Sequence, residues 1–188
     1  MRRGAAGDAE EDDRLIRAVV AGEPVAWRLL VERHLGAITG FAWYMLGDRA
    51  EAEDVAQEVF LRLLAKVAAW EPGGPGLRPW LHRVAINLCV DRARAPRPDP
   101  LEDQPEPVAE GEPGVGLDRQ RLVRRALDAL PERQRIAIVL VYYQDCSDRE
   151  AALIMGVSTE ALESLLARGR RSLRRRLDPL RADLLGAS

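Results

Sequence analysis

The sequence has little cysteine, and the cysteine that it has is not arranged to bind a metal. Only Cys89 and Cys146 occur among the 188 residues, with no CxxC pair or Cys/His cluster. Structural zinc sites need such spacing, so we expect no metal and no cofactor. We interpret both residues as reduced thiols of a cytosolic protein. A redox-sensing role is an alternative, but nothing near either cysteine in the sequence favours a low thiol pKa.

Long uncharged stretches are also missing. The longest run without Asp, Glu, Lys or Arg covers residues 34–47, which is fourteen residues, whereas a transmembrane helix needs about 20. Arg2 and Arg3 are not followed by the apolar segment that a signal peptide contains. We therefore expect a cytoplasmic protein with no membrane insertion.

Aromatic residues make up only 5% of the chain, and β-branched residues are sparse beside Leu, Ala, Arg and Glu. This balance favours helix over strand, so we expect an all-α fold. A hydrophobic content of 47% is enough for packed cores. A length of 188 residues suits two small domains better than one average domain.

Proline and glycine are concentrated in one segment that divides the chain. Residues 96–116 contain six prolines and three glycines, with one basic and six acidic side chains. Such a composition predicts an extended acidic linker. Residues 1–10 are small and acidic and are predicted to form a disordered tail. The remaining segments, 11–95 and 117–180, are the two expected helical domains. Residues 14–95 and 117–188 each carry a small excess of basic side chains.

Apolar periodicity and capping signals predict four helices in each domain. In the first domain we expect helices over residues 12–21, 24–46, 49–70 and 79–94. In the second domain we expect helices over residues 117–129, 131–144, 148–155 and 159–177.

The last two expected helices have the pattern of a helix-turn-helix. Ala152 is small where two helices must cross, Gly156 tolerates the positive φ of the turn, and Ser158 is a natural N-cap. An ordinary αα-hairpin is the alternative interpretation. The arginine-rich segment that follows favours DNA binding.

A helical wheel at about 100° per residue divides the last helix into two faces. The inward face holds Leu162, Leu165, Leu166, Gly169 and Leu173. The outward sector holds Ser164, Arg168, Arg171 and Arg175. Arginines in this sector can bind phosphates or guanine edges in a major groove, although a solvated basic face is the alternative.

The fourth expected helix carries a second polar edge formed by Arg83, Asn87 and Arg94. Two guanidinium groups and an amide can contact phosphates and one base. The Gly/Pro-rich loop between Trp70 and Trp80 can shape a pocket for an unstacked base. For both tryptophans we favour core packing over a role at such a pocket.

The third expected helix has an acidic outer face made of Glu53, Asp54, Gln57, Glu58 and Arg62. A metal-dependent enzyme built on these carboxylates and His34 lacks ligand spacing, and no Gly-rich phosphate loop lies nearby. We therefore expect no enzyme and favour a partner-binding face over a merely solvated one. His82 is expected to be a surface residue or a satisfied one, not a ligand.

These motifs resemble those of a known family. Residues 52–60 (Ala-Glu-Asp-Val-Ala-Gln-Glu-Val-Phe) and 80–94 resemble region 2 of bacterial sigma factors. Residues 130–137, together with the helix-turn-helix that follows, resemble region 4. With two such domains and a short linker, the chain is similar to the extracytoplasmic-function (ECF) group.

The resemblance implies a promoter-specificity subunit that binds core RNA polymerase and promoter DNA and that an anti-sigma protein holds inactive. The face that would dock on the β′ clamp helices comprises Glu53, Asp54, Gln57, Glu58 and Arg62. The residues that would capture the melted −10 element, with the loop at 71–78, are Trp80, Arg83, Asn87 and Arg94. The residues that would read the −35 element are Ser158, Thr159, Ser164, Arg168, Arg171 and Arg175. Region 4 would also contact the β flap, and the linker would run toward the polymerase channels.

The chain departs from the family pattern on the last helix. Glu163 and Leu165 stand where a basic residue is frequent, so we expect no base contacts from them. Gly169 replaces a usual Ala, a change that is expected to loosen the helix by roughly 1 kcal/mol.

The alternative function is an autonomous helix-turn-helix regulator, which would bind a palindromic duplex as a dimer without polymerase. It leaves the first 95 residues unexplained. Such a linker leaves two arrangements of the free protein open, one in which the two domains touch and one in which they do not.

Overall fold

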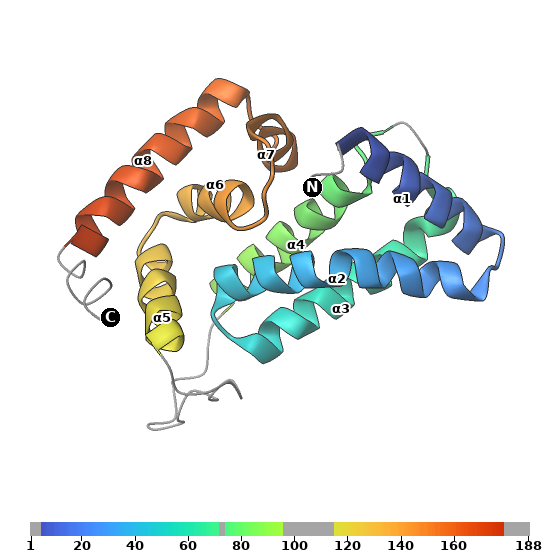
Figure 1. Ribbon diagram of the computed structural model, residues 1–188, viewed down its shortest axis with the longest axis horizontal. Helices are drawn as coiled ribbons and strands as arrows, with labels where there is room; N and C mark the ends of the chain where they lie inside the picture. The colour runs from blue at the N-terminus through green and yellow to red at the C-terminus, as the bar shows by residue number, and fades with distance from the viewer. Residues whose placement is uncertain (1–4, 72–73, 96–114, 179–188) are drawn as a thin grey trace.

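The computed structural model describes residues 5–71, 74–95 and 115–178, and this part of the chain is helical with no strand (Figure 1). The all-α prediction is therefore confirmed. The N-terminal bundle consists of α1 (Ala5–Val20), α2 (Pro24–Leu46), α3 (Arg49–Lys66), the 3-10 helix η1 (Val67–Ala69) and α4 (Leu77–Arg94). The C-terminal bundle consists of α5 (Val115–Asp128), α6 (Glu132–Tyr142), α7 (Asp148–Met155) and α8 (Thr159–Leu177).

Local sequence signals set several helix ends. Gly47 ends α2 with a φ of 80°, a left-handed conformation that favours glycine. Asp48 then caps α3, since its carboxylate accepts a hydrogen bond from a first-turn N–H at 2.8 Å. Gly156 has a φ of 63° between α7 and α8. The hydroxyl of Ser158 accepts from the backbone N–H of Ala161 at 3.2 Å, as the N-cap prediction requires.

Helix α2 is the central element of the N-terminal bundle and packs against α1, α3 and α4. Its residues Leu30, Ile38 and Phe41 are fully buried. They belong to a core that also contains Val55, Val59, Leu63, Leu77 and Leu81. Burying a side chain of this size stabilises a fold by about 1.5–3 kcal/mol, so this stripe accounts for the position of α2.

Helix α1 begins at Ala5, so the prediction of a disordered tail over residues 1–10 is wrong for residues 5–10. Ion pairs hold this segment against α2. Arg33 lies 2.5 Å from Asp8 and 3.0 Å from Asp12, and Asp12 also contacts the ring of His34 at 2.9 Å. A composition argument misses these pairs because the partners lie on another helix.

The predictions for residues 1–4 and for the linker over 96–114 fall outside the described residues. The same is true of residues 72–73 in the loop and of residues 179–180 at the end of the second expected domain. Residues 115 and 116, which we assigned to the linker, belong to α5.

In the C-terminal bundle, α8 packs across α6 and α7. Leu162 and Leu166 are buried on its inward face, together with Gly169. A Cβ atom at Gly169 would lie 3.0 Å from Cγ1 of Ile138, closer than ordinary van der Waals contact. The glycine therefore lets α8 approach α6. From the sequence we expected Gly169 only to loosen its own helix, and we did not predict this packing role.

The two bundles lie against each other, with α2 and α4 on one side and α5, α6 and α7 on the other (Figure 1). Gln144, in the α6–α7 loop, is buried against α2, where its amide nitrogen donates to the carbonyl of Ala37 at 3.0 Å. The ring of Tyr143 stacks on that of Tyr44, with centroids 4.1 Å apart. The free protein therefore adopts a closed arrangement in this structure.

Candidate polymerase and nucleic-acid interfaces

The five residues that we predicted to bind polymerase all lie on α3. The set comprises Glu53, Asp54, Gln57, Glu58 and Arg62. Two of them form an ion pair, since Arg62 Nε lies 2.8 Å from Glu58 Oε1, and both side chains stay at least 40% exposed. Asp54 and Gln57 are exposed as well. The face is therefore accessible and carries more negative than positive charge.

Two exposed leucines extend this α3 face. Leu61 is 53% exposed and Leu64 is 49% exposed. Our sequence reasoning counted Leu64 with the inward apolar residues and so missed it, although a residue seven positions after Gln57 lies on nearly the same side of a helix. Apolar side chains beside carboxylates give the face the mixed character of a protein-binding surface.

The edge formed by Arg83, Asn87 and Arg94 is exposed, but it lies beside the C-terminal bundle. All three side chains line a cleft of about 860 Å³ between α4 and the C-terminal bundle. Met155 and Gly156, at the turn of the helix-turn-helix, lie across this cleft. The structure thus brings a predicted −10-reading edge against the predicted −35-reading unit.

The arginines of this edge are engaged by the C-terminal bundle. Nη2 of Arg83 donates to the carbonyl of Leu153 at 2.8 Å, and its Nε lies 3.5 Å from the carbonyl oxygen of Ile154. Nη2 of Arg94 donates to Oε1 of Glu132 at 3.1 Å. These pairings join residues far apart in the sequence, and no local pattern reveals them.

Trp80 and Trp70 form an edge-to-face pair with ring centroids 5.9 Å apart. Both rings are partly buried and pack against the core, as the core-packing alternative requires. Trp80 also stands at the start of α4, next to the loop that we predicted to hold an unstacked base. Its partial exposure leaves part of the ring available for stacking.

His82 is buried, with 1% of its surface exposed, so the expectation of a surface position is wrong. Its Nδ1 lies 2.9 Å from the carbonyl oxygen of Arg78, and its ring meets Phe41 edge-on. Burial lowers the pKa of His82 to about 4, and the positive charge of Arg78 acts in the same direction. The imidazole is therefore neutral at physiological pH.

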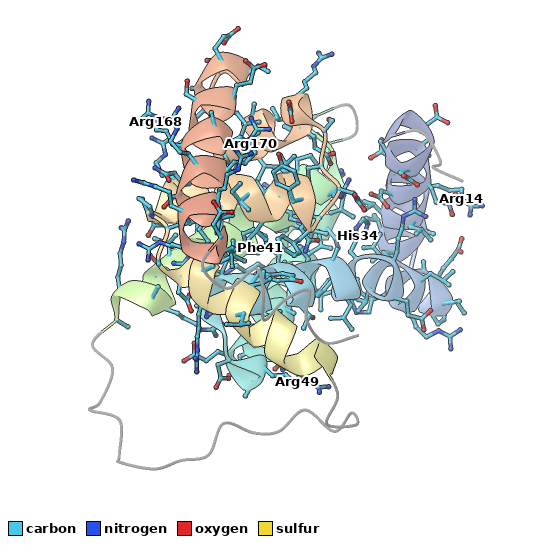
Figure 2. All side chains as sticks on the ribbon, turned by 60° about the vertical axis from the view of Figure 1, so that its left-hand side comes forward. Arg14, His34, Phe41, Arg49, Arg168 and Arg170 are labelled. Atoms are coloured by element: carbon cyan, nitrogen blue, oxygen red, sulfur yellow. The ribbon has the colours of Figure 1, made fainter. Side chains whose placement is uncertain are left out.

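The outward face of α8 is exposed along its length. This face holds Ser164, Arg168, Arg171 and Arg175, with Thr159 in the first turn. Figure 2 shows Arg168 on the side of α8 that faces away from the bundle. Arg170 lies on another side, where it donates to the hydroxyl of Tyr142 at 3.3 Å. Ser158 is also exposed but caps the helix.

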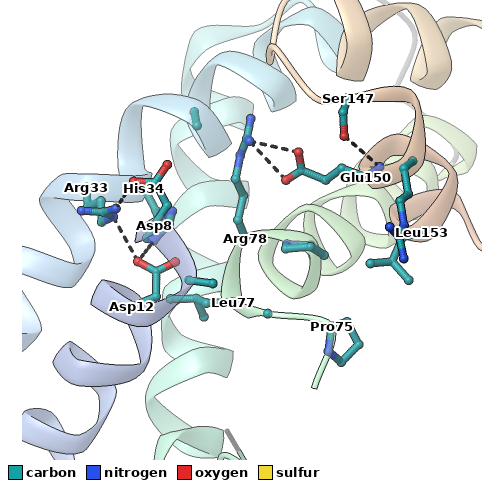
Figure 3. Close-up of a pocket in the computed structure, with 15 residues that line it drawn as sticks. Asp8, Asp12, Arg33, His34, Pro75, Leu77, Arg78, Ser147, Glu150 and Leu153 are labelled. Carbon is teal, nitrogen blue, oxygen red and sulfur yellow. Dashed lines mark hydrogen bonds and ion pairs between the residues drawn. The ribbon is translucent and has the colours of Figure 1, made fainter. Parts of the chain in front are cut away.

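A second cavity, of about 500 Å³, lies between the bundles near the start of α4 (Figure 3). Arg78 reaches across it from α4, and its Nη1 lies 3.1 and 3.2 Å from the two carboxylate oxygens of Glu150 on α7. Arg78 also donates to the carbonyl of Gln144. Neither Arg78 nor Glu150 was among our predicted site residues, since their relation depends on how the bundles meet.

Within the described part of the chain, no set of three or more His, Cys, Asp and Glu side chains is grouped so as to hold a metal ion. None of the described helices has the length and apolar content that a membrane span requires. Cys89 and Cys146 are free and buried, and burial raises the pKa of each thiol to about 12. Neither is poised to react as a thiolate.

Comparison with protein families assigns both bundles. Residues 30–97 match Sigma-70 region 2, and residues 120–173 match Sigma-70, region 4. The first match begins within α2, so α1 precedes it.

Curated relatives are similar along most of the chain. The chain is 33% identical over 178 residues to the ECF RNA polymerase sigma factor SigM of Mycobacterium tuberculosis, covering 93% of this chain and 89% of that protein. It is 28% identical over 180 residues to SigW of Bacillus subtilis, covering 88% and 96%. The match to SigE of Mycolicibacterium smegmatis is 32% identical over 157 residues and covers 79% of this chain but only 60% of that protein.

Two solved structures share the fold. CnrH, determined in complex with the cytosolic domain of CnrY, has a TM-score of 0.73 and 27% identity, covering 90% of this chain and 98% of CnrH. The sigma factor RpoE of Bartonella quintana, in complex with the anti-sigma factor NepR, has a TM-score of 0.65 and 26% identity, covering 82% and 98%.

Proposed function

The chain belongs to the ECF RNA polymerase sigma factors, and on that premise we propose that it directs core RNA polymerase to specific promoters and assists promoter opening. The observation that carries this proposal is the presence of both sigma regions, in order, in one chain. The family consists of transcription initiation factors, so the work of the protein is binding and not covalent chemistry. An autonomous regulator would leave the region 2 match without a role.

The α3 face binds the β′ clamp helices of core polymerase. Support comes from the exposed Asp54, the partly exposed Glu58 and the apolar Leu61 and Leu64 beside them. Glu53, Gln57 and Arg62 complete this surface. Carboxylates steer and align the contact, while the leucines supply buried apolar area. The C-terminal bundle contacts the β flap.

The start and outer edge of α4 capture the melted −10 element. Trp80 stacks on an unpaired base, and Arg83, Asn87 and Arg94 contact phosphates and base edges. Extracting a base from the duplex costs a few kcal/mol, which these contacts offset. This assignment is supported by the position of two guanidinium groups and one amide along the same edge of α4.

Helix α8 reads the −35 element in the major groove. Arg168, Arg171 and Arg175 are exposed and form no ion pair with a carboxylate within the described residues. Arg168 lies on the side of α8 that faces away from the bundle (Figure 2). Thr159 and Ser164 share that exposed side, and Ser158 fixes the helix start. Arginine in the major groove pairs with guanine and with phosphates.

An anti-sigma protein holds the factor inactive. Support comes from RpoE of the same fold, which was determined in complex with the anti-sigma factor NepR. We place the protein in the cytoplasm because core polymerase and promoter DNA are there.

Reversing charges on α3 tests the polymerase contact. In the variant Asp54→Lys/Glu58→Lys, two attractive contacts with the clamp become repulsive. We therefore expect the free energy of binding to core polymerase to weaken by about 1–3 kcal/mol. The measurement is a fluorescence titration of labelled protein with bacterial core polymerase. The matched control is Glu10→Lys/Glu32→Lys, which makes the same charge change at exposed positions on α1 and α2. Equal binding by both variants would remove α3 from the interface.

A further inference from the structure

Helix α8 begins with an acidic side chain, Glu160, that the proposed function leaves without a role. Resting on the assignment of α8 to the −35 element, we propose that Glu160 is a specificity-determining residue that selects cytosine at one position of that element. Its carboxylate accepts a hydrogen bond from the N4 amino group of the cytosine in the major groove. The exposed face of α8 then distinguishes bases in its first turn and binds mainly phosphates farther along.

Glu160 lies in the middle of the exposed face of α8. Gly169, nine positions later, is buried where α8 packs on α6. At about 100° per residue, this separation places Glu160 about 180° around the helix from the packed side. Ser164 and Arg171 lie within about 40° of Glu160, and all three side chains are exposed. Glu160 therefore shares the side on which the proposed −35 contacts lie.

Charge is distributed unevenly along α8. Residues 159–167 contain two glutamates and no basic residue, whereas residues 168–177 contain six arginines. The amino-terminal residues of a recognition helix contact base edges in the major groove, and arginines bind phosphates. Phosphates repel a carboxylate, but a base edge can offer it a hydrogen-bond donor. The position of Glu160 in the first turn therefore favours a contact with a base.

Cytosine is the base whose major-groove edge suits a carboxylate best. Cytosine presents the N4 amino donor and no acceptor, whereas adenine places the acceptor N7 beside its N6 donor. Guanine presents two acceptors, and thymine presents one acceptor and a methyl group. Because an ionised carboxylate only accepts hydrogen bonds, it is attracted to the cytosine edge and repelled by the acceptors of the other bases.

Local hydrogen bonds keep Glu160 ionised and in place. A bond from its own backbone N–H, and a second from the Ser158 hydroxyl, lower the pKa of the Glu160 carboxyl group. The oxygen of the same hydroxyl accepts from the backbone N–H of Ala161 at 3.2 Å. Ser158 therefore positions both the start of α8 and the Glu160 carboxylate. The positive end of the helix dipole also lies at this turn and stabilises the negative charge.

The test compares the base preferences of holoenzymes made from full-length chains and bacterial core polymerase. The template library has a randomised −35 element and keeps every other position of a promoter that the wild-type holoenzyme transcribes. Sequencing the transcribed templates gives the preferred base at each −35 position. The variants are Glu160→Gln and Glu160→Ala. The matched control is Glu163→Gln, which makes the same charge change at an exposed residue about 60° away around the helix.

We expect the wild type to prefer cytosine by roughly tenfold at one position on one strand of the −35 element. Glu160→Ala should lose this preference and keep the preferences at the other positions. Glu160→Gln should move the preference to adenine, because an amide can bond to N6 and N7 together. Glu163→Gln should keep the cytosine preference.

Unchanged base preferences in both Glu160 variants would overturn the proposal, because Glu160 would then act only on the start of the helix. Absence of a cytosine preference from every −35 position in the wild type would overturn it too. Equal changes in Glu160→Gln and Glu163→Gln would also contradict it, since they would indicate a general effect of charge. In all these outcomes the holoenzyme still initiates. Failure of the wild type to initiate with core polymerase would instead overturn the proposed function.

Discussion

His82 is a buried titratable residue at the centre of the fold, and its protonation state must matter for stability. The folded protein lowers the pKa of His82 from 6.5 to about 4, mainly through burial. Below pH 6.5 the unfolded chain binds a proton that the folded chain does not bind. This contribution to stability is therefore complete above pH 6.5 and is lost as the pH falls from 6.5 through 4.

We predict that the free energy of unfolding falls by roughly 3 kcal/mol between pH 7 and pH 4 on account of His82 alone. Urea unfolding at pH 7, 5.5 and 4.5 measures this loss. The variant His82→Phe replaces the imidazole with a ring that cannot ionise, so its stability should depend less on pH. Parallel pH dependence in the wild type and the variant would show that His82 is protonated without penalty.

Individual residues also show which parts of the site a sequence can reveal. The exposure of Arg168 and Arg171 and the capping role of Ser158 follow from positions on one helix, and the structure agrees. The burial of His82 and the pairing of Arg83 depend on a neighbouring helix or a neighbouring bundle. Periodicity within one element does not contain that information.

At the scale of the element, the contact between α6 and α8 depends on Gly169. A side chain at this position would press on Ile138, because even a Cβ atom would lie 3.0 Å from it. Because Gly169 sets the distance between α8 and α6, it also positions the proposed DNA-reading face of α8.

We predict that Gly169→Leu destabilises the protein by about 1–3 kcal/mol through overpacking, despite the better helix propensity of leucine. Thermal unfolding monitored by circular dichroism measures the change. The control is Ala167→Leu on the exposed side of α8, which should leave the melting temperature nearly unchanged. Equal effects of the two substitutions would mean that α8 does not pack closely on α6.

Helix bounds were predicted well where capping residues mark them. The expected start and end of α2, α7 and α8 agree with the structure, because Pro24, Gly47, Gly156 and Ser158 act locally. The start of α1 was predicted too late. Its first turns are held by ion pairs from Asp8 and Asp12 to Arg33, and such tertiary contacts are invisible in a run of acidic residues.

At the scale of the whole molecule, the family follows from the order of motifs, while the closed arrangement does not. The contacts between bundles join residues that lie far apart in the chain, as in Arg78 and Glu150, which are 72 positions apart. Small shifts in bundle orientation would break them without changing either bundle. The sequence therefore predicts the binding faces but not how the two bundles meet.

The most direct test of the sigma function is run-off transcription with bacterial core RNA polymerase on a library of promoters. Added protein should produce new transcription start sites that core polymerase alone does not use. The variant Arg168→Ala/Arg171→Ala should lose these transcripts, because it removes two proposed −35 contacts. The control Arg170→Ala should keep them, since Arg170 contacts Tyr142 instead. Absence of new start sites, together with tight binding of the protein alone to duplex DNA, would contradict the account.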